Sequence, residues 1–249
     1  MNTSSESSTT VAVIGAGRLG RVLAVALRHA GFEVRGPLGR TDGIPASDIV
    51  LLCVPDAEIA TAARAARPHA RLLGHVSGAT PLDDVDFSLH PLQTFTGAET
   101  PDVLRGIGAA VAGRTPDAVH AARTIAEALG ARPFTVDDAH RAGYHAAASL
   151  SSNLLLTVLD AAERVALAAG IRSEGTRELL APLVTRTVEN WVRTGAAAAL
   201  TGPIARGDEE TVRRQREAVA STVPELSALF DRLCADTAAL ARRPERVSA

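Results

Sequence analysis

A glycine-rich segment near the start of the chain constrains its fold more than any other feature. Residues 15–20 read GAGRLG, directly after the apolar run 11–14 and before apolar residues at helical spacing. In such a turn the first glycine permits the tight bend, the second lets the backbone approach a pyrophosphate, and the third lets helix and strand pack closely. The start of the helix also favours negative charge. The segment predicts a dinucleotide-binding turn, with a glycine turn that binds nothing as the alternative. Its predicted cofactor-binding residues are Gly15, Gly17, Arg18, Leu19 and Gly20.

Residues 11 to about 136 alternate short apolar runs with helical patterns, as repeated β-α units do. Such apolar strands indicate a parallel sheet covered by helices on both faces. Only seven residues separate Arg40 from Asp48, too few for the helix of a normal crossover, so a loop is expected there. The expected strands are 11–14, 32–35, 49–54, 72–76, 87–89, 108–112 and 133–136, with a helix at 116–129.

The sequence changes character at Asp137, where long helical patterns replace the strand patterns. A helix capped by Asp137 or Asp138 is expected to continue to residue 169 and to end at Gly170. Because such a helix would be about 50 Å long, one small domain could not cover it, and a homodimer is expected. Two further helices are expected, at 173–193 and 209–241.

These patterns predict three parts. Residues 1–10 form a loose tail, 11–136 a dinucleotide-binding domain, and 137–249 an all-helical substrate and dimerisation domain. The tail lacks the basic and apolar regions of a signal peptide, and no apolar run is long enough to cross a membrane. A cytoplasmic protein is expected.

The composition excludes several chemistries. All 26 Lys+Arg residues are arginine, so Schiff-base chemistry, P-loop phosphate binding and any lysine acid or base are ruled out. A net charge of −2 without a basic block gives no indication of a nucleic-acid partner. The two cysteines and the histidines have no metal-ligand spacing, so no metal is predicted.

The end of the second strand indicates which dinucleotide is bound. An NAD-specific site places a carboxylate there, but this chain has no acidic residue before Asp42. Arg40 and Thr41 could instead hold a 2′-phosphate, although Arg40 could equally be a solvated loop residue. NADP(H) is therefore predicted, with NAD(H) left open. Val54 and Pro55, which end the third strand, complete the predicted cofactor site.

Four sequence strings resemble a known family. HPLQTF, YHAAASLSSN and ALTGPIARGD, together with GAGRLG, resemble a bacterial Rossmann-like family whose C-terminal half is of unknown function. That family lies within the superfamily of 6-phosphogluconate dehydrogenases, ketopantoate reductases and pyrroline-carboxylate reductases. The resemblance covers residues 11–241. It implies an α/β fold, with a Rossmann-type parallel sheet followed by an all-α domain like that of 6-phosphogluconate dehydrogenase.

One departure from the superfamily concerns the acid/base residue. β-Hydroxyacid dehydrogenases have a lysine four residues before an asparagine, and those positions are Ser149 and Asn153 here. His145, Ser149 and Asn153 follow one stripe of the predicted helix, which suits a cleft. His90-Pro91 resembles the His-Pro of prephenate dehydrogenases, whose histidine contacts the substrate hydroxyl. The alternative for each histidine is a hydrogen-bonded structural residue.

The predicted function is NADP(H)-dependent reduction of a small carbonyl substrate, such as a 2-oxo acid of the ketopantoate kind. Imine reduction is the alternative within enzymes, and a dinucleotide-binding sensor or scaffold is the alternative outside them. The predicted catalytic residues are His90, His145 and Asn153. The predicted substrate-binding residues are Ser77, Gln93, Ser149 and Arg206.

Overall fold

The computed structural model describes residues 8–171 and 175–243, and the chain divides into two compact units. The first unit runs to Ser152 and the second begins at Asn153. The predicted tail at 1–10 lies mainly outside the described residues, and Thr10 already belongs to the first strand. None of the helices in the described ranges is long and apolar enough to cross a membrane.

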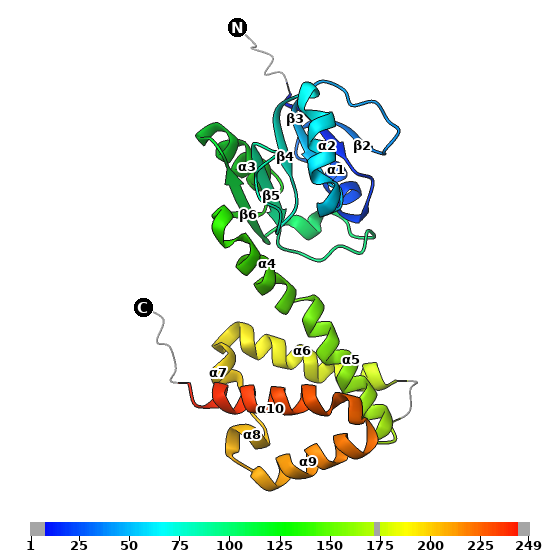
Figure 1. The fold of residues 1–249 in the computed structure, drawn as a ribbon, viewed down its shortest axis with the longest axis vertical. Coiled ribbons are helices and arrows are strands. Elements are labelled where there is room, and N and C mark those ends of the chain that lie inside the picture. Colours follow the sequence, from blue (N-terminus) through cyan, green and yellow to red (C-terminus); the bar gives the residue numbers. More distant parts are fainter. Residues whose placement is uncertain (1–7, 172–174, 244–249) are drawn as a thin grey trace. The chain divides into compact units, whose positions relative to one another are not determined.

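The first unit is built on one sheet of seven strands. These are β1 (Thr10–Ile14), β2 (Glu33–Leu38), β3 (Ser47–Leu52), β4 (Ala70–His75), β5 (Phe87–Pro91), β6 (Gly108–Gly113) and β7 (Arg132–Thr135). Their order across the sheet is β2-β1-β3-β4-β5-β6-β7. Figure 1 shows this part of the chain in blue to green. All seven expected strands are present, and the predicted Rossmann-type α/β fold is confirmed.

The direction of the last two strands corrects the expectation of a wholly parallel sheet. β1 to β5 run parallel, whereas β6 is antiparallel to β5 and β7 follows the direction of β6. The connection between β5 and β6 holds only a short 3₁₀ helix, η3 (Pro101–Leu104). A parallel neighbour needs a long crossover, usually an α-helix, and an antiparallel neighbour does not. The connection over residues 92–107 has no α-helix, which fits the reversal.

Helices cover both faces of the sheet. Successive side chains of a strand point to opposite faces, so Val11 and Val13 pack with α1 (Arg18–His29) while Ala12 packs on the other side with α2 (Ile59–Ala66). The helix α3 (Pro116–Ala128) covers the same face as α1. Burial on both faces is the reason that the strands read as continuous apolar runs.

The register of the parallel strands places several loops at one edge of the sheet. Ile14 pairs with Leu52, Leu52 with His75, and His75 with Ser88. The turn after β1, the loops after β3 and β4, and the last residues of β5 therefore lie at the same carboxyl edge. As expected, the chain passes from β2 to β3 through a loop without a helix. Ligands of open α/β sheets bind at such an edge.

The predicted continuous helix over 138–169 is wrong. The structure has a 3₁₀ turn, η4 (Asp138–His140), then α4 (Arg141–Leu150) and α5 (Asn153–Ala168). At the break, the hydroxyls of Ser151 and Ser152 donate to the carbonyls of Ala147 and Ala148, at 2.9 and 2.8 Å. Such bonds to the carbonyl four residues earlier bend and weaken helices. The two compact units divide at this break, after Ser152, and side chains of α4 bind Ser88 and His90 of β5 in the first unit. The domain boundary at 137 stays a prediction.

The second unit consists of helices. These are α5, α6 (Thr176–Thr194), α7 (Ala196–Ala199), α8 (Pro203–Arg206), α9 (Glu209–Thr222), η5 (Pro224–Leu226) and α10 (Ser227–Ala241). The predicted single helix over 209–241 is wrong, because Val223 leaves the helical conformation before Pro224, with φ at −141° and ψ at 62°, and proline disfavours a helical residue before it. The predicted helix start at 173 lies outside the described residues. Asp208 caps α9 by accepting the N–H of Thr211 at 3.0 Å.

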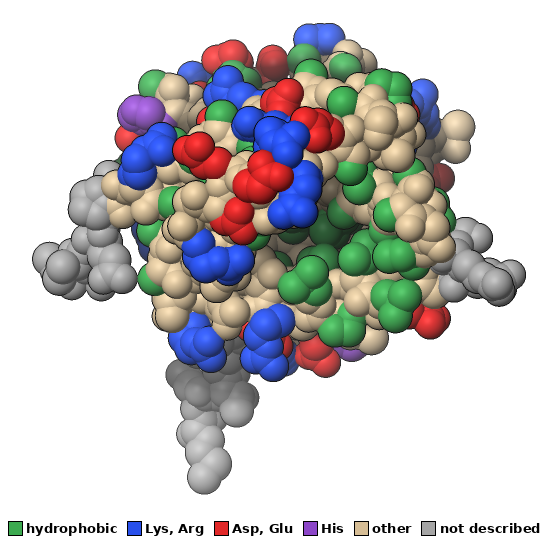
Figure 2. All heavy atoms as spheres, turned by 90° about the horizontal axis from the view of Figure 1, so that it is seen from below, with side chains coloured by type: hydrophobic (Ala, Val, Ile, Leu, Met, Phe, Trp, Pro, Cys, Tyr) green, Lys and Arg blue, Asp and Glu red, His purple; other side chains and the backbone are tan. Residues whose placement is uncertain are grey.

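The second unit buries little of its own apolar surface. Among its described residues, the buried hydrophobic side chains are Ala166, Val219, Val223 and Cys234. Large apolar side chains of α5 and α6 are instead exposed, including Leu156, Leu179, Leu183 and Trp191. The space-filling view shows hydrophobic side chains gathered around a hollow, beside a ridge of acidic and basic side chains (Figure 2).

Candidate active site

The glycine turn after β1 has the geometry that its sequence predicts. Gly15 has a φ of +113°, and a Cβ there would lie 2.3 Å from the carbonyl oxygen of Cys53. A Cβ at Gly20 would lie 1.9 Å from the carbonyl oxygen of Gly15. The packing of the chain itself therefore requires glycine at both positions.

Gly17 is a glycine for a different reason. Its φ is −70° with ψ at −174°, an extended conformation that any residue adopts, and a Cβ there would meet no atom within 4 Å. Gly17 is also the residue before α1, where the first helical N–H groups point outward. Open space in front of a helix N-terminus suits a phosphate group. The turn can therefore take the pyrophosphate of a dinucleotide, with Gly17 leaving room for it.

The loops that follow β2 and β3 lie on either side of the glycine turn, because β1 lies between these two strands in the sheet. The carbonyl of Leu38, the last residue of β2, accepts the N–H of Gly15 at 2.8 Å. Asp42 accepts the N–H of Gly39 at 2.7 Å, so the first carboxylate after β2 holds its own loop. The Arg40 side chain is 84% exposed and forms an ion pair with Glu58 of η1 (Asp56–Glu58).

The other predicted cofactor residues lie in the same neighbourhood. The backbone nitrogen of Val54 is 3.3 Å from the position of a Gly15 Cβ, and Pro55 follows it. Thr41 is exposed beside Arg40. Leu19 packs against the core, so its side chain supports the turn from within. Arg18 lies against Gly97, where a Cβ would be 3.0 Å from Arg18 Cγ.

A cluster of aromatic side chains lies near the end of β5. His90 Nδ1 and the Tyr144 hydroxyl are hydrogen-bonded at 2.7 Å. The ring centres of His90 and His145 are 6.1 Å apart, and Phe134 of β7 contacts the Tyr144 ring edge-on at 5.9 Å. The two predicted histidines, from β5 and α4, are thus brought together.

Gly78, in the loop after β4, allows this cluster to form. A Cβ at Gly78 would lie 2.9 Å from His145 Cδ2 and 2.9 Å from His90 Nδ1. Any larger residue would displace a histidine ring. The loop after β4 therefore closes on the cluster from the glycine-turn side of β5, because β4 lies between β3 and β5 in the sheet.

The surroundings of the cluster disfavour charge on its members. Burial, together with the neighbouring His145, lowers the pKa of His90 to about 4. Burial also raises the pKa of Tyr144 to about 12, against a smaller lowering by Arg141. At neutral pH His90 is therefore a neutral imidazole and Tyr144 a neutral phenol. The pair can donate or accept a hydrogen bond without carrying a net charge.

The predicted residue Ser77 serves its own loop. Its hydroxyl oxygen accepts the N–H groups of Ala79 and Thr80, at 3.1 and 3.0 Å. The fully buried His75 holds the same loop, since its Nδ1 accepts the N–H of Ser77 at 3.2 Å and its Nε2 is 3.2 Å from the carbonyl of Pro81. Because Pro81 can only accept, His75 carries its hydrogen on Nε2. These contacts shape the loop that carries Gly78.

The other predicted substrate residues are placed as follows. Gln93, two residues after β5, accepts the N–H of Thr94 at 2.8 Å through its side-chain oxygen. Ser149 is half-buried on α4, one turn beyond His145. Asn153 begins α5, and Arg206 ends α8. Those last two belong to the second unit, and their roles stay predictions.

Two functional candidates were not found from the sequence. Tyr144 contacts His90, and Arg141 is a buried arginine that bonds Asp138 and donates to Ser88 Oγ at 2.5 Å. Asp138 also accepts the N–H of Leu82 at 3.1 Å, so it does not cap α4 as predicted. The spacing of these residues could have placed them beside His145, because one stripe of a helix contains residues 141, 144, 145 and 148. Tyr144 is also the only tyrosine in the chain.

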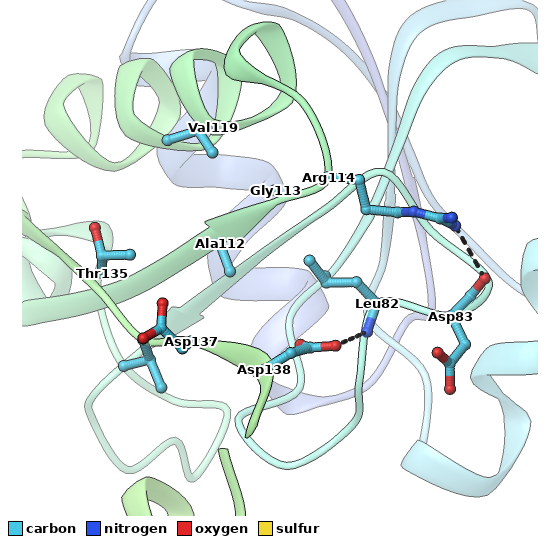
Figure 3. A pocket seen from close by; sticks show the side chains of 10 residues that line it. Leu82, Asp83, Ala112, Gly113, Arg114, Val119, Thr135, Asp137 and Asp138 are labelled. Carbon is cyan, nitrogen blue, oxygen red and sulfur yellow. Dashed lines mark hydrogen bonds between the residues drawn. The ribbon is translucent and has the colours of Figure 1, made fainter. Parts of the chain in front are cut away.

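A pocket of about 370 Å³ lies elsewhere in the first unit, where β6 and β7 end (Figure 3). Since Gly113 at the end of β6 pairs with Phe87, the pocket lies toward the start of β5 and not toward its end at His90. Figure 3 shows Asp138 bonded to Leu82 and Arg114 reaching the carbonyl of Asp83, at 3.3 Å. These polar groups hold loops together, and the pocket contains neither predicted histidine.

Several solved structures have the same fold over nearly the whole chain. A provisionally named NADP oxidoreductase from Bacteroides fragilis is 21% identical, with a TM-score of 0.77, and the match covers 93% of this chain and 98% of that one. A Thermotoga maritima protein is 21% identical, with a TM-score of 0.79, covering 94% and 100%. Plasmodium falciparum pyrroline carboxylate reductase with NADP bound is 11% identical, with a TM-score of 0.57, covering 94% and 98%.

The sequence itself places the chain in a family. No curated protein gives a significant match. The profile of a family described as a domain of unknown function (DUF2520) matches residues 107–237, which is more than half of the chain. The match spans β6, β7 and most of the helices that follow. The chain therefore belongs to the DUF2520 family.

Proposed function

We propose that this chain is an NADP(H)-dependent oxidoreductase that reduces a small carbonyl compound of the 2-oxo acid class. One observation carries the proposal: the open space at Gly17 and the His90–Tyr144 pair lie at the same edge of the sheet. A bound reduced nicotinamide would supply the hydride. The residues that would hold the cofactor are those of the glycine turn, together with Arg40, Thr41, Val54 and Pro55.

The loop after β5 supports this arrangement. It leaves the sheet at Pro91, directly after His90, and reaches Arg18 at the start of α1 through Gly97. The candidate proton-handling group and the phosphate-binding turn are therefore connected by one short segment within the first unit. The likeness to an NADP oxidoreductase and to a reductase with NADP bound is consistent with such a site.

Two glycine substitutions separate cofactor binding from folding. We expect Gly17→Ala to leave the free energy of unfolding within about 0.5 kcal/mol, because the added methyl group meets no atom of the chain. The same methyl group should weaken NADPH binding at least about tenfold by entering the space for the pyrophosphate. Gly20→Ala should instead destabilise the fold by about 1–3 kcal/mol through overpacking. Urea denaturation and calorimetric titration of NADPH would measure both, and a Gly17→Ala variant with unchanged NADPH affinity would contradict the assignment.

The charged residues that follow β2 and β3 predict the cofactor preference. Arg40 can donate to a 2′-phosphate, and the first carboxylate after β2, Asp42, is bonded to Gly39, so we expect NADPH to bind more tightly than NADH. Arg40→Ala should remove most of that preference. Glu58→Gln should strengthen NADPH binding, because it removes a negative charge that competes for the same guanidinium. Titration of each variant with both cofactors would measure this.

Arg64→Ala on α2 is a matched control, since Arg64 is an exposed arginine that bonds only Thr61 among the described contacts. Its cofactor preference should equal that of the wild type. Equal affinities of the wild type for the two cofactors would overturn the assignment of NADP(H). So would an Arg40→Ala variant that keeps its preference.

We also propose that the protein is a homodimer assembled through its second unit. That unit has too few buried apolar residues to stand alone, and its α6 exposes Leu179 and Leu183 at 68% and 66%. A groove of about 520 Å³ between α5, α8, α9 and α10 is lined mainly by hydrophobic side chains. Exposed apolar surface of this extent is typical of a protein interface.

We expect a dimer at micromolar concentration in sedimentation experiments. The double variant Leu179→Glu, Leu183→Glu should dissociate, since four charges would be buried in a symmetric interface that contains both copies of this helix face. Val25→Glu is the control, because it places a charge at an exposed apolar position of α1 in the first unit. A monomeric wild type, or a double variant that remains dimeric, would contradict the proposal.

A further inference from the structure

We propose that Tyr144 is a positioning residue that holds His90 as the neutral tautomer with its hydrogen on Nε2, so that His90 donates this hydrogen to a carbonyl oxygen. The inference rests on the proposed function and deepens it, because it selects a neutral carbonyl over a protonated imine as the substrate. Its starting point is the bond between Tyr144 and His90 Nδ1.

The direction of that bond follows from acidity. A phenol is a stronger acid than a neutral imidazole N–H, so Tyr144 donates and His90 Nδ1 accepts, at 2.7 Å. The ring of Tyr144 is held by the edge-on contact with Phe134, which fixes where its hydroxyl points. With Nδ1 occupied as an acceptor, the hydrogen of neutral His90 must be on Nε2.

Nε2 is available to a ligand. Within the described part of the chain, no hydrogen bond involves His90 Nε2, and no buried side-chain nitrogen or oxygen lacks a partner. Nε2 therefore reaches solvent while Nδ1 is engaged. This separates the two ring nitrogens: Nδ1 is held by the protein, and Nε2 is free to bind a ligand.

The charged and titratable groups around His90 keep it neutral. His145 and Arg141 of α4 and His75 of β4 disfavour a positive charge on the ring, and Asp56 of η1 is the one group here that favours it. Burial has the largest effect, and together these groups hold the pKa of His90 at about 4. A neutral donor can stabilise negative charge that develops on a carbonyl oxygen. An iminium nitrogen has no lone pair to accept that hydrogen bond.

The proton transfer that follows is balanced. As the carbonyl carbon gains the hydride, the π electron pair of the C=O bond moves to the oxygen. The oxygen forms its O–H bond with the Nε2 hydrogen, and Nδ1 takes the phenolic hydrogen of Tyr144. Burial disfavours the tyrosinate that remains and Arg141 partly offsets this, so the tyrosinate regains a proton from water. The product is an alcohol, and the nicotinamide is oxidised.

The tautomer of His90 is the decisive measurement, and it needs neither substrate nor cofactor. Long-range proton–nitrogen correlation spectra of the ¹⁵N-labelled full chain should show His90 as the Nε2–H tautomer at pH 7. The signals are assigned by their loss in His90→Gln. Tyr144→Phe, which retains the ring and its contact with Phe134, should give a mixture of both tautomers. A wild type with any other His90 pattern would overturn the proposal, whether or not the variant folds. An unchanged pattern in Tyr144→Phe would overturn it as well.

Kinetics test the substrate class. NADPH oxidation would be followed with pyruvate and 2-oxoisovalerate as oxo acids and with 1-pyrroline as the imine. Tyr144→Phe should lower kcat with the oxo acids by about 10²-fold, the lower end of the range for losing a proton-transfer group, with KM and NADPH affinity nearly unchanged. His140→Gln, a substitution of an exposed histidine on η4, is the control.

Failure of the proposed function and failure of the inference about Tyr144 would give different results. Loss of the proposed function would appear as no NADPH binding, or as no turnover with either substrate class, and the tautomer result would be unaffected by it. Reduction of 1-pyrroline but of no oxo acid would overturn the substrate class. Full oxo-acid turnover in Tyr144→Phe would overturn the role of Tyr144.

Discussion

Replacing His90 by alanine is expected to lower kcat for reduction of a 2-oxo acid by about 10²- to 10⁴-fold, the usual effect of losing an acid/base group. His90 is the histidine whose second ring nitrogen is held by Tyr144, so its loss removes both the donor and its link to the phenol. The affinity for NADPH should barely change, because His90 lies outside the glycine turn. Steady-state NADPH oxidation and a separate cofactor titration would measure the two quantities.

Two further histidine variants sharpen this test. His145→Ala should reduce kcat less than His90→Ala, since His145 contacts the cluster without a hydrogen bond to Tyr144 among the described contacts. His140→Ala should have no effect, because His140 is exposed on η4. If His90→Ala and His145→Ala both retained near-full turnover, neither histidine would handle the proton. The site would then have to position an already protonated substrate, or serve as a cofactor sensor.

The pH dependence of kcat/KM carries the same information. From the sequence alone, a histidine acid would be expected to titrate near neutral pH. The structure changes that expectation, because burial lowers the pKa of His90 to about 4. A reaction that needs neutral His90 keeps its rate as the pH falls from 7 to 5 and loses it as the pH falls through about 4. His90→Ala should remove this acid limb from its residual activity.

The sequence was sufficient for the strands and for the glycine turn because both are local patterns. Each strand is a short apolar run, and the three glycines that the turn requires lie within residues 15–20, although the turn also contacts Leu38 and Cys53. Apolar runs do not record strand direction. The reversal at β6 depends on the connection after β5, which carries η3 in place of a crossover helix. Direction was therefore missed where the strands themselves were found.

The helical half was predicted less well for two physical reasons. The break between α4 and α5 comes from serine hydroxyls that bond to carbonyls, and apolar periodicity does not register such bonds. The break before Pro224 was visible in the sequence, since a proline restricts the residue before it. The apolar pattern continued across both sites and concealed both interruptions.

The catalytic cluster could be predicted only in part because its contacts are distant in sequence. His90 and Tyr144 are 54 residues apart, and no local pattern joins them. The two histidines were found through family resemblance and helical spacing, but the Tyr144 phenol on α4 was not. Arg141 was missed for a related reason: its partner Ser88 is 53 residues away, and an arginine in a helix is usually on the surface.

Replacing Arg141 by methionine is expected to lower the free energy of unfolding by about 3 kcal/mol. That is the lower end of the range for breaking a buried ion pair, since Asp138 is 41% exposed and keeps some contact with water. The guanidinium bonds both Asp138 and Ser88, so methionine leaves a buried hydroxyl and a carboxylate without their donor. Urea denaturation followed by circular dichroism would measure the loss.

Arg105→Met provides a matched control, because Asp102 and Arg105 form an ion pair at the same three-residue spacing but on the surface. Loss of this exposed ion pair should lower the free energy of unfolding by less than about 1 kcal/mol, as is usual for exposed pairs.

Burial raises the pKa of Asp138, but hydrogen bonds from Arg141 and the Leu82 N–H together hold this pKa below its ordinary value. Since its folded pKa is the lower one, the ionised Asp138 stabilises the fold above the unfolded pKa of about 4, and that contribution is lost as the pH falls through the folded pKa. The difference between the wild type and Arg141→Met should therefore narrow below about pH 4, because the wild type loses there the ion pair that the variant lacks at every pH. Equal, small losses in the two arginine variants at pH 7 would show that α4 is held to the sheet by its aromatic contacts alone.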